Sequence, residues 1–154
     1  MTLMLDPTLS DAAILRSVRK FFIDEFKTVE GIPLYFEFID KQPTDAEGNK
    51  LDRWMCVIPR NSVRGTLSTK HFHIYLFSSG DTDGYKLSEF RDIVYEKLVD
   101  FSHTDCKKRV ACYDSSWTQQ FVAVVQVLDD MNFDLYTEGI NLKILPFLLN
   151  WGAK

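Results

Sequence analysis

Two histidines in a strand-like run have the spacing that comes closest to a metal site. His71 and His73 are two positions apart, so on a strand both side chains point to the same face. His103 and Cys106 offer two further ligands later in the chain. Structural zinc sites pair their cysteines and histidines more tightly than this. Polar residues on the wet face of a strand explain the histidine pair, and we expect no bound metal and no other cofactor.

A second pattern, Asp81, Asp83 and Gly84, invites comparison with a calcium-binding loop. When Gly84 is aligned with the invariant glycine of such a loop, Phe90 falls where a bidentate carboxylate is required. We therefore expect these residues to form the turn before a helix.

The sequence contains no local pattern of a nucleophile and its base. It has no GxSxG motif, its three cysteines stand in no recognisable catalytic context, and its seven glycines form no phosphate-binding loop. We expect that the protein is not an enzyme. A small enzyme assembled from scattered His, Asp and Cys residues remains an alternative.

The overall charge argues against a partner held through its phosphates. The chain carries a net charge of −4, and its only basic run is residues 107–109. Proteins that bind nucleic acid tightly place a basic stripe against the backbone. The initial order α-β-β-β-α matches a double-stranded-RNA-binding domain, but the basic helix start and lysine-rich loop of that domain are missing.

Length and cysteine usage favour a single intracellular domain. A chain of 154 residues is of single-domain size. An odd number of cysteines without CxxC spacing is typical of a reducing compartment. The longest apolar stretch, residues 144–149, is far shorter than the ~20 residues of a membrane span. The first residues do not resemble a signal peptide, and we expect no membrane partner.

Hydrophobic periodicity predicts two helices and six strands in the order α-β-β-β-α-β-β-β. The first helix follows Ser10 as its N-cap and ends near residue 29, with a buried stripe through Val18 and Phe22. The second helix follows Ser88 as its N-cap and ends near residue 101. The predicted strands are residues 32–39, 53–58, 66–77, 109–113, 120–128 and 140–149, with loops at 40–52, 59–65 and 129–139. Together these elements predict one α+β domain over residues 1–154, with a mixed or mostly antiparallel sheet and both helices on one face.

The end of the chain carries more apolar residues than one face of a strand needs. Phe147, Leu149 and Trp151 follow a run in which apolar and polar residues alternate. A strand that is apolar on both faces must be covered on both, either by the core or by a neighbouring subunit. We consider these three residues, with Phe133 and Tyr136 of the preceding connector, as candidates for a subunit interface.

The order of elements, the length and several segments resemble the tail-terminator proteins of long-tailed bacteriophages. The matching parts are the amphipathic helix of residues 10–26 and the strand after it, the long strand 66–77, the Asp/Gly loop, the helix 87–101, and a late strand pair ending in Gly-Ile-Asn-Leu-Lys-Ile at residues 139–144. The resemblance covers most of the chain as an architecture and contains no catalytic signature.

The resemblance implies a structural protein of the virion neck, made in the host cytoplasm. Six copies would form a ring that caps the tail tube, and the partners would be further copies of the chain, the tail tube protein and a head-completion or neck protein. DNA would pass through the ring without specific binding, because carboxylates facing the channel repel phosphates. The acidic candidates for this lining are Asp81, Asp83, Asp129, Asp130, Asp134 and Glu138.

Two other interpretations remain for these acidic loops and for the protein. The loops could simply be solvated, and the chain could be another small neck or adaptor protein of a multiprotein assembly. The genes beside this one would distinguish the two roles, since neighbouring tail-tube and tape-measure genes favour the tail terminator.

Overall fold

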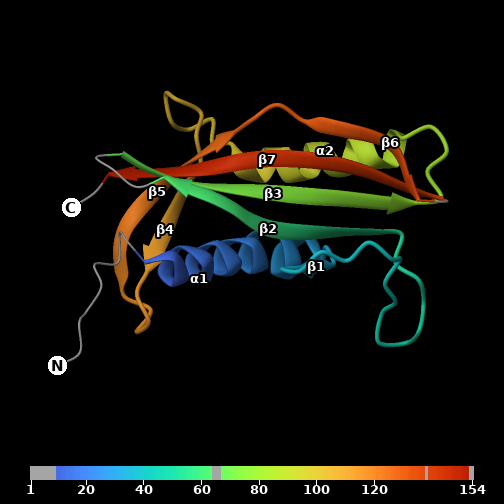
Figure 1. Ribbon diagram of the computed structural model, residues 1–154, viewed down its shortest axis with the longest axis horizontal. Helices are drawn as coiled ribbons and strands as arrows, with labels where there is room; N and C mark the ends of the chain where they lie inside the picture. The colour runs from blue at the N-terminus through green and yellow to red at the C-terminus, as the bar shows by residue number, and fades with distance from the viewer. Residues whose placement is uncertain (1–9, 64–66, 138, 153–154) are drawn as a thin grey trace.

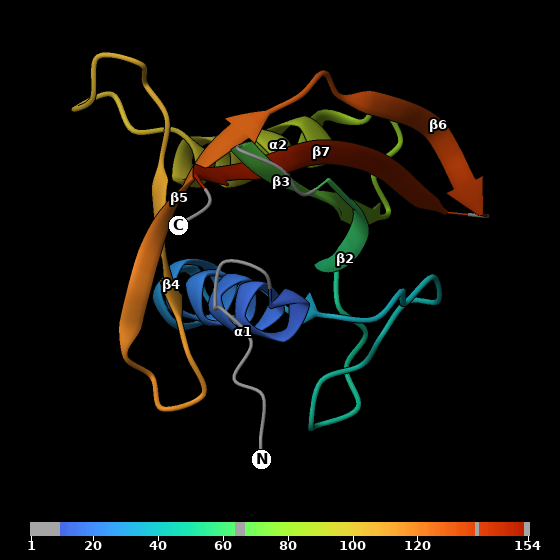
Figure 2. The ribbon, with the colours of Figure 1, turned by 60° about the vertical axis from the view of Figure 1, so that its left-hand side comes forward.

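The computed structural model describes residues 10–63, 67–137 and 139–152, with the backbone alone described for 132–137. Its central feature is a seven-stranded sheet that curls around helix α1 (Asp11–Phe22), while helix α2 (Tyr85–Leu98) lies behind the middle strands of the sheet (Figures 1 and 2). The predicted α+β class is therefore confirmed. No helix in these ranges is long and apolar enough to cross a membrane.

The last strand of the chain organises the sheet. The strands are β1 (Leu34–Tyr35), β2 (Arg53–Val63), β3 (Leu67–Ser79), β4 (Arg109–Tyr113), β5 (Gln119–Val127), β6 (Met131–Thr137) and β7 (Ile140–Gly152). Their order in the sheet is β1-β2-β3-β7-β5-β4, and β6 also pairs with β7. β3 pairs with β7 along its whole length, while β5 and β6 share the other side of β7. Among the strand pairs that the structure describes, β1–β2 is the one parallel pair.

Helix α1 is capped as the sequence predicts. The Ser10 hydroxyl accepts a hydrogen bond from the backbone N–H of Ala13 at 3.2 Å. The helix then widens into the π-helical segment η2 (Ile23–Thr28), so the predicted single helix is continuous but changes its winding. Ser17 fixes α1 to the edge strand β4, because its hydroxyl donates to the Ala13 carbonyl and accepts the Tyr113 N–H at 2.8 Å.

Helix α2 begins earlier than predicted, and Ser88 is not its N-cap. Gly84 takes that position with φ of 77°, a left-handed conformation that glycine adopts without steric cost. The helix needs no cap from Ser88, because the Asp81 carboxylate accepts the N–H groups of Lys86 and Leu87. The loop around Asp81 is thus the turn before the helix that the sequence predicts.

Three strand predictions are corrected by the structure. The first predicted strand is reduced to two residues, Leu34–Tyr35. The predicted turn at 59–65 is wrong up to Val63, because β2 continues through a register shift between Pro59 and Ser62. The acidic connector contains strand β6, so the predicted order lacks one strand. Pairing with β7 makes this segment a strand, and the alternation of apolar and polar residues from Met131 to Leu135 is compatible with that.

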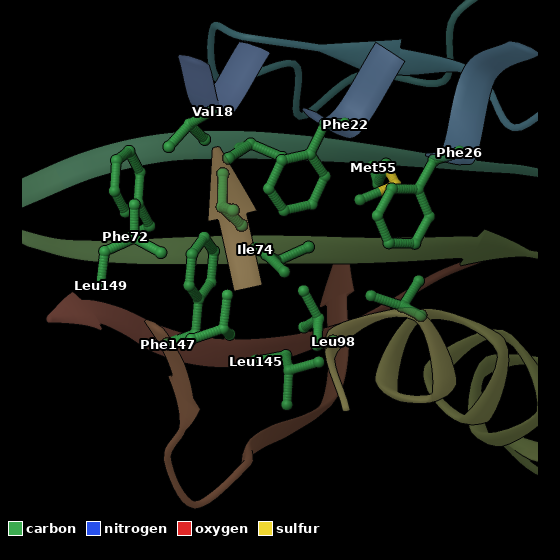
Figure 3. Close-up of a cluster of buried hydrophobic side chains, with 14 of the residues drawn as sticks. Val18, Phe22, Phe26, Met55, Phe72, Ile74, Leu98, Leu145, Phe147 and Leu149 are labelled. Atoms are coloured by element: carbon green, nitrogen blue, oxygen red, sulfur yellow. The ribbon is translucent and has the colours of Figure 1, made fainter. Parts of the chain in front are cut away.

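The main core lies between the sheet and both helices (Figure 3). Phe22 and Phe26 of the first helical segment stack with their ring centroids 5.0 Å apart. Phe72 of β3 stacks on Phe147 of β7 at 5.1 Å, and Phe147 meets Phe22 at 5.7 Å. Aromatic contacts thus connect α1 to the two central strands.

The opposite face of the sheet carries a second buried cluster. Trp54 stacks on Phe77 at 4.9 Å, and its indole N–H donates to the Ile39 carbonyl at 2.8 Å. Phe38 packs edge-on against Tyr75 and Phe77. The segment after β1 therefore covers this face, which explains why β7 is apolar on both sides.

Candidate interaction surface

The three predicted interface residues near the C-terminus lie in the core. Phe147, Leu149 and Trp151 are at most 3% exposed, and all belong to the cluster between sheet and helices. A neighbouring subunit could reach them only if the core opened, so they do not form a contact surface. The side chains of Phe133 and Tyr136 lie outside the described residues.

The predicted channel carboxylates fall into different environments. Asp81 is buried, and although burial raises its pKa, hydrogen bonds from the Leu87 and Lys86 N–H groups and the Ser78 hydroxyl lower that pKa below its usual value. Asp81 caps the start of helix α2 and is too buried to line a channel. Asp130 is half-buried, and its carboxylate accepts a hydrogen bond from the Arg91 guanidinium at 2.8 Å.

Two of the predicted carboxylates are available to solvent. Asp83 and Asp129 are exposed, so both remain candidates for an acidic surface. The Asp134 side chain and the whole of Glu138 lie outside the described residues.

The histidines do not form a metal centre. His73 accepts a hydrogen bond from Arg60 at 3.3 Å, and burial, Arg60 and His71 together lower its pKa. His103 lies in the turn after α2, 3.5 Å from Asp100. Among the residues that the structure describes, no three His, Cys, Asp or Glu side chains form a group that could hold a metal ion.

A groove runs along the outer side of α1 and has the composition of a binding surface. It encloses about 560 Å³. We define the α1 groove by its apolar residues Leu15, Ile23 and Trp117 and its cations Arg16, Arg19 and Lys20; Ala12 and Asp24 complete its lining. Tryptophan and arginine are the residues most enriched at energetically important protein contacts.

Hydrogen bonds hold the backbone of Trp117 at the edge of this groove. It is 53% exposed and has φ of 59°, a left-handed conformation that is uncommon for a bulky residue. The β4–β5 loop imposes it: the Trp117 N–H donates to the Asp114 carbonyl, and the Asp114 carboxylate accepts the N–H groups of Ser116 and Thr118. Such strain costs on the order of 1–3 kcal/mol and is found mainly at functional positions.

The cations of the groove are positioned by their neighbours. The Arg19 guanidinium lies 5.3 Å from the centre of the Phe36 ring, and Arg16 donates to the Tyr113 carbonyl at 3.5 Å. Lys20 pairs with Asp24 at 2.5 Å, and this hydrogen bond raises the pKa of the lysine. Within the described part of the chain, Lys20 is the one cation of the groove that pairs with a carboxylate, so the groove keeps an excess of positive charge.

The sequence alone predicts that the cations of the α1 groove are exposed, but it does not predict that Trp117 is. The cations Arg16, Arg19 and Lys20 lie mostly off the buried stripe of the first helix, so their exposure follows from helical periodicity. The exposure of Trp117 does not, because it depends on how the β4–β5 hairpin wraps around α1 (Figure 2). A tryptophan in a serine-rich loop is otherwise expected to be buried.

Helix α2 presents an outer face of the opposite charge. Glu89, Asp92 and Glu96 are exposed at helical spacing, and we call them the α2 acidic face. Glu89 and Asp92 border a hollow of about 650 Å³ that the cations Arg53 and Lys86 also line. The basic neighbours Arg91 and Lys97 also have other partners, Asp130 and Glu30 respectively.

Strand β2 has an open outer edge beyond Cys56. β1 pairs only with Met55 and Cys56, and no other described strand pairs with that side of β2. Val63, at the end of this edge, is 58% exposed. Pro59 removes one donor from the edge, a common means of limiting unwanted strand pairing.

Comparison with known proteins adds no family to these observations. No protein-family model matches the chain, and no curated protein matches it significantly.

Proposed function

We propose that this chain is a structural subunit of a phage tail–head junction, similar to the tail terminators, and that about six copies form a ring on the tail tube. The confirmed α+β class, which hydrophobic periodicity predicts, is compatible with the proposal. Of the elements that carry the resemblance, α1, the long strand β3, helix α2 and a late strand pair are present, while the strand after the first helix is reduced to Leu34–Tyr35.

The observation that carries the proposal is a pair of unlike contact surfaces on one chain. A ring subunit joins one surface to a different surface of its neighbour, and the ring closes when the rotations complete a turn. The α1 groove is basic with an exposed indole, while the α2 acidic face has the opposite charge. The open edge of β2 supplies a further surface for contact with the tube or neck.

The acidic surface suits a channel through which DNA moves. Asp83 and Asp129 are exposed carboxylates in loops, and the net charge of −4 is repeated with every subunit of a ring. Carboxylates discourage phosphates from sticking, although salt screens the repulsion beyond ~8 Å.

Labelling of intact particles tests the proposal. Gold-conjugated antibody against this chain, applied to phage particles from the genome that encodes it, should mark the junction between tail and head. Label on the capsid or the tail tip, or none on the particle while the chain accumulates in the cell, would contradict the proposed role.

A further inference from the structure

We infer that the α1 groove of one copy receives the α2 acidic face of the next copy. This inference rests on the proposed ring and specifies which two surfaces join its subunits. The contact would place Glu89, Asp92 and Glu96 opposite Arg16 and Arg19, with Trp117 at the margin.

Charge complementarity identifies a second copy as the occupant. The chain is acidic overall, yet three cations gather along one side of α1. Three carboxylates occupy the outer side of α2 at matching helical spacing. Opposite potentials of this kind orient partners during encounter and suppress contacts between like surfaces.

The two surfaces cannot meet within one molecule. The α1 groove and the hollow beside α2 share no lining residue. Phe22 of α1 and Leu98 of α2 belong to the same core, so both helices are held at fixed places in the fold (Figure 3). A contact between them must therefore join different copies. In the proposed ring the neighbour that receives the contact does not return it, so the contact is heterologous and does not stop at a dimer.

The composition of the groove indicates where the binding energy would be concentrated. Trp117 offers a large apolar surface on a loop backbone that hydrogen bonds already hold, so little further ordering of that backbone is needed on binding. On the acidic side, half-buried Ile93 lies next to Asp92 and supplies apolar area for the indole. The surrounding charge pairs would make the association sensitive to salt.

Charge reversal with rescue tests the contact. In sedimentation experiments at low ionic strength, Arg19→Glu should weaken self-association about tenfold or more. Lys27→Glu is the matched control, because Lys27 is an exposed cation just beyond α1 that does not line the groove. Adding Glu89→Lys and Glu96→Lys to Arg19→Glu should restore association. Equal weakening by the control, or no rescue in variants with native circular dichroism, would overturn the contact.

Cross-linking tests the same contact and leaves the charged residues of the α1 groove unchanged. In a Cys106→Ser background, Ala12→Cys lies in the groove and Glu89→Cys lies on the α2 acidic face. A short bismaleimide should join successive copies into a ladder beyond the dimer, at the highest soluble concentration and on particles. Dimers alone, or no product in either sample, would overturn the contact.

The outcomes separate this inference from the proposed function. A chain that labels at the neck but gives no ladder keeps its proposed role and loses this contact. A ladder from a chain that is absent from the neck keeps the contact and overturns the role.

Discussion

Asp81 shows at the scale of a single residue how a carboxylate that looks available for a channel is instead used by the fold. Its oxygens accept the N–H groups of Lys86 and Leu87 and the hydroxyl of Ser78. Its own carbonyl accepts the side-chain amide of Asn141 at the start of β7. The residue therefore joins the first turn of α2 to two strands.

Replacing Asp81 with alanine should destabilise the protein by about 1–2 kcal/mol, as expected for loss of a helix-capping acceptor. The folded-state pKa of Asp81 lies below its usual value of 3.8. Its stabilising contribution is therefore complete above the unfolded pKa and is lost as the pH falls through the folded pKa. Urea unfolding should show that Asp81→Ala has a lower free energy of unfolding than wild type at pH 7. The difference between the two proteins should be smaller near pH 3. Asp129→Ala, at an exposed position, is the control, and a pH-independent difference for Asp81→Ala would refute the assignment.

The three cysteines should differ in reactivity. Burial raises the pKa of Cys56 to about 11 and that of Cys112 to about 12, while Cys106 is exposed. Because the thiolate is the reactive form, a thiol reagent at pH 8 should modify one cysteine quickly in the native protein and all three in denaturant. Mass spectrometry should place the fast label on Cys106. Rapid native labelling of Cys112 would show that β4 does not pack as described.

At the scale of elements, the sequence correctly predicts the helices and strands whose apolar residues, by their spacing, mark the face that is buried in the structure. The apolar stripe through Val18 and Phe22 is the buried face of α1, and both are in the main core. Strand β6 escapes prediction because the carboxylates Asp129, Asp130 and Glu138 on either side of it suggest an acidic connector, although the strand's own residues alternate between apolar and polar and pair with β7. The start of α2 was misplaced because Asp81 caps it from outside the helix, which no local motif indicates.

Phe22 gives the clearest test of the packing of α1. It is fully buried and contacts the rings of Phe21, Phe26 and Phe147. Phe22→Ala should lower the free energy of unfolding by about 3–5 kcal/mol, because a large side chain is lost from a closely packed core. Phe101→Ala, at a position 77% exposed, should change it by less than about 0.5 kcal/mol. Equal unfolding midpoints for wild type and Phe22→Ala would mean that the stripe does not face the core.

At the scale of the whole molecule, the coverage of β7 explains both what the sequence predicts and what it does not. The apolar residues of this strand indicate burial on two faces, and the structure supplies both covers within one chain. The second cover comes from residues 36–39, which were predicted as part of a strand. Long-range coverage of this kind has no local signature, so Phe147, Leu149 and Trp151 looked like candidates for an interface.

The interaction surfaces follow from the same arrangement. The cations of α1 could be placed outside from the sequence, but the α1 groove forms only where the β4–β5 hairpin brings Trp117 beside them. The charge of the α2 acidic face is visible in the sequence, whereas its role as the complement of the α1 groove requires both helices to be fixed in one core. The ring model depends on these two surfaces together.

Imaging of the assembled particle by cryo-electron microscopy tests the central proposal most directly. The account predicts a six-fold ring at the head-proximal end of the tail tube, with one copy of this fold in each repeat and the α1 groove facing the α2 acidic face of the next copy. Density for this chain elsewhere in the particle, or a ring whose symmetry is unrelated to six, would contradict the proposal.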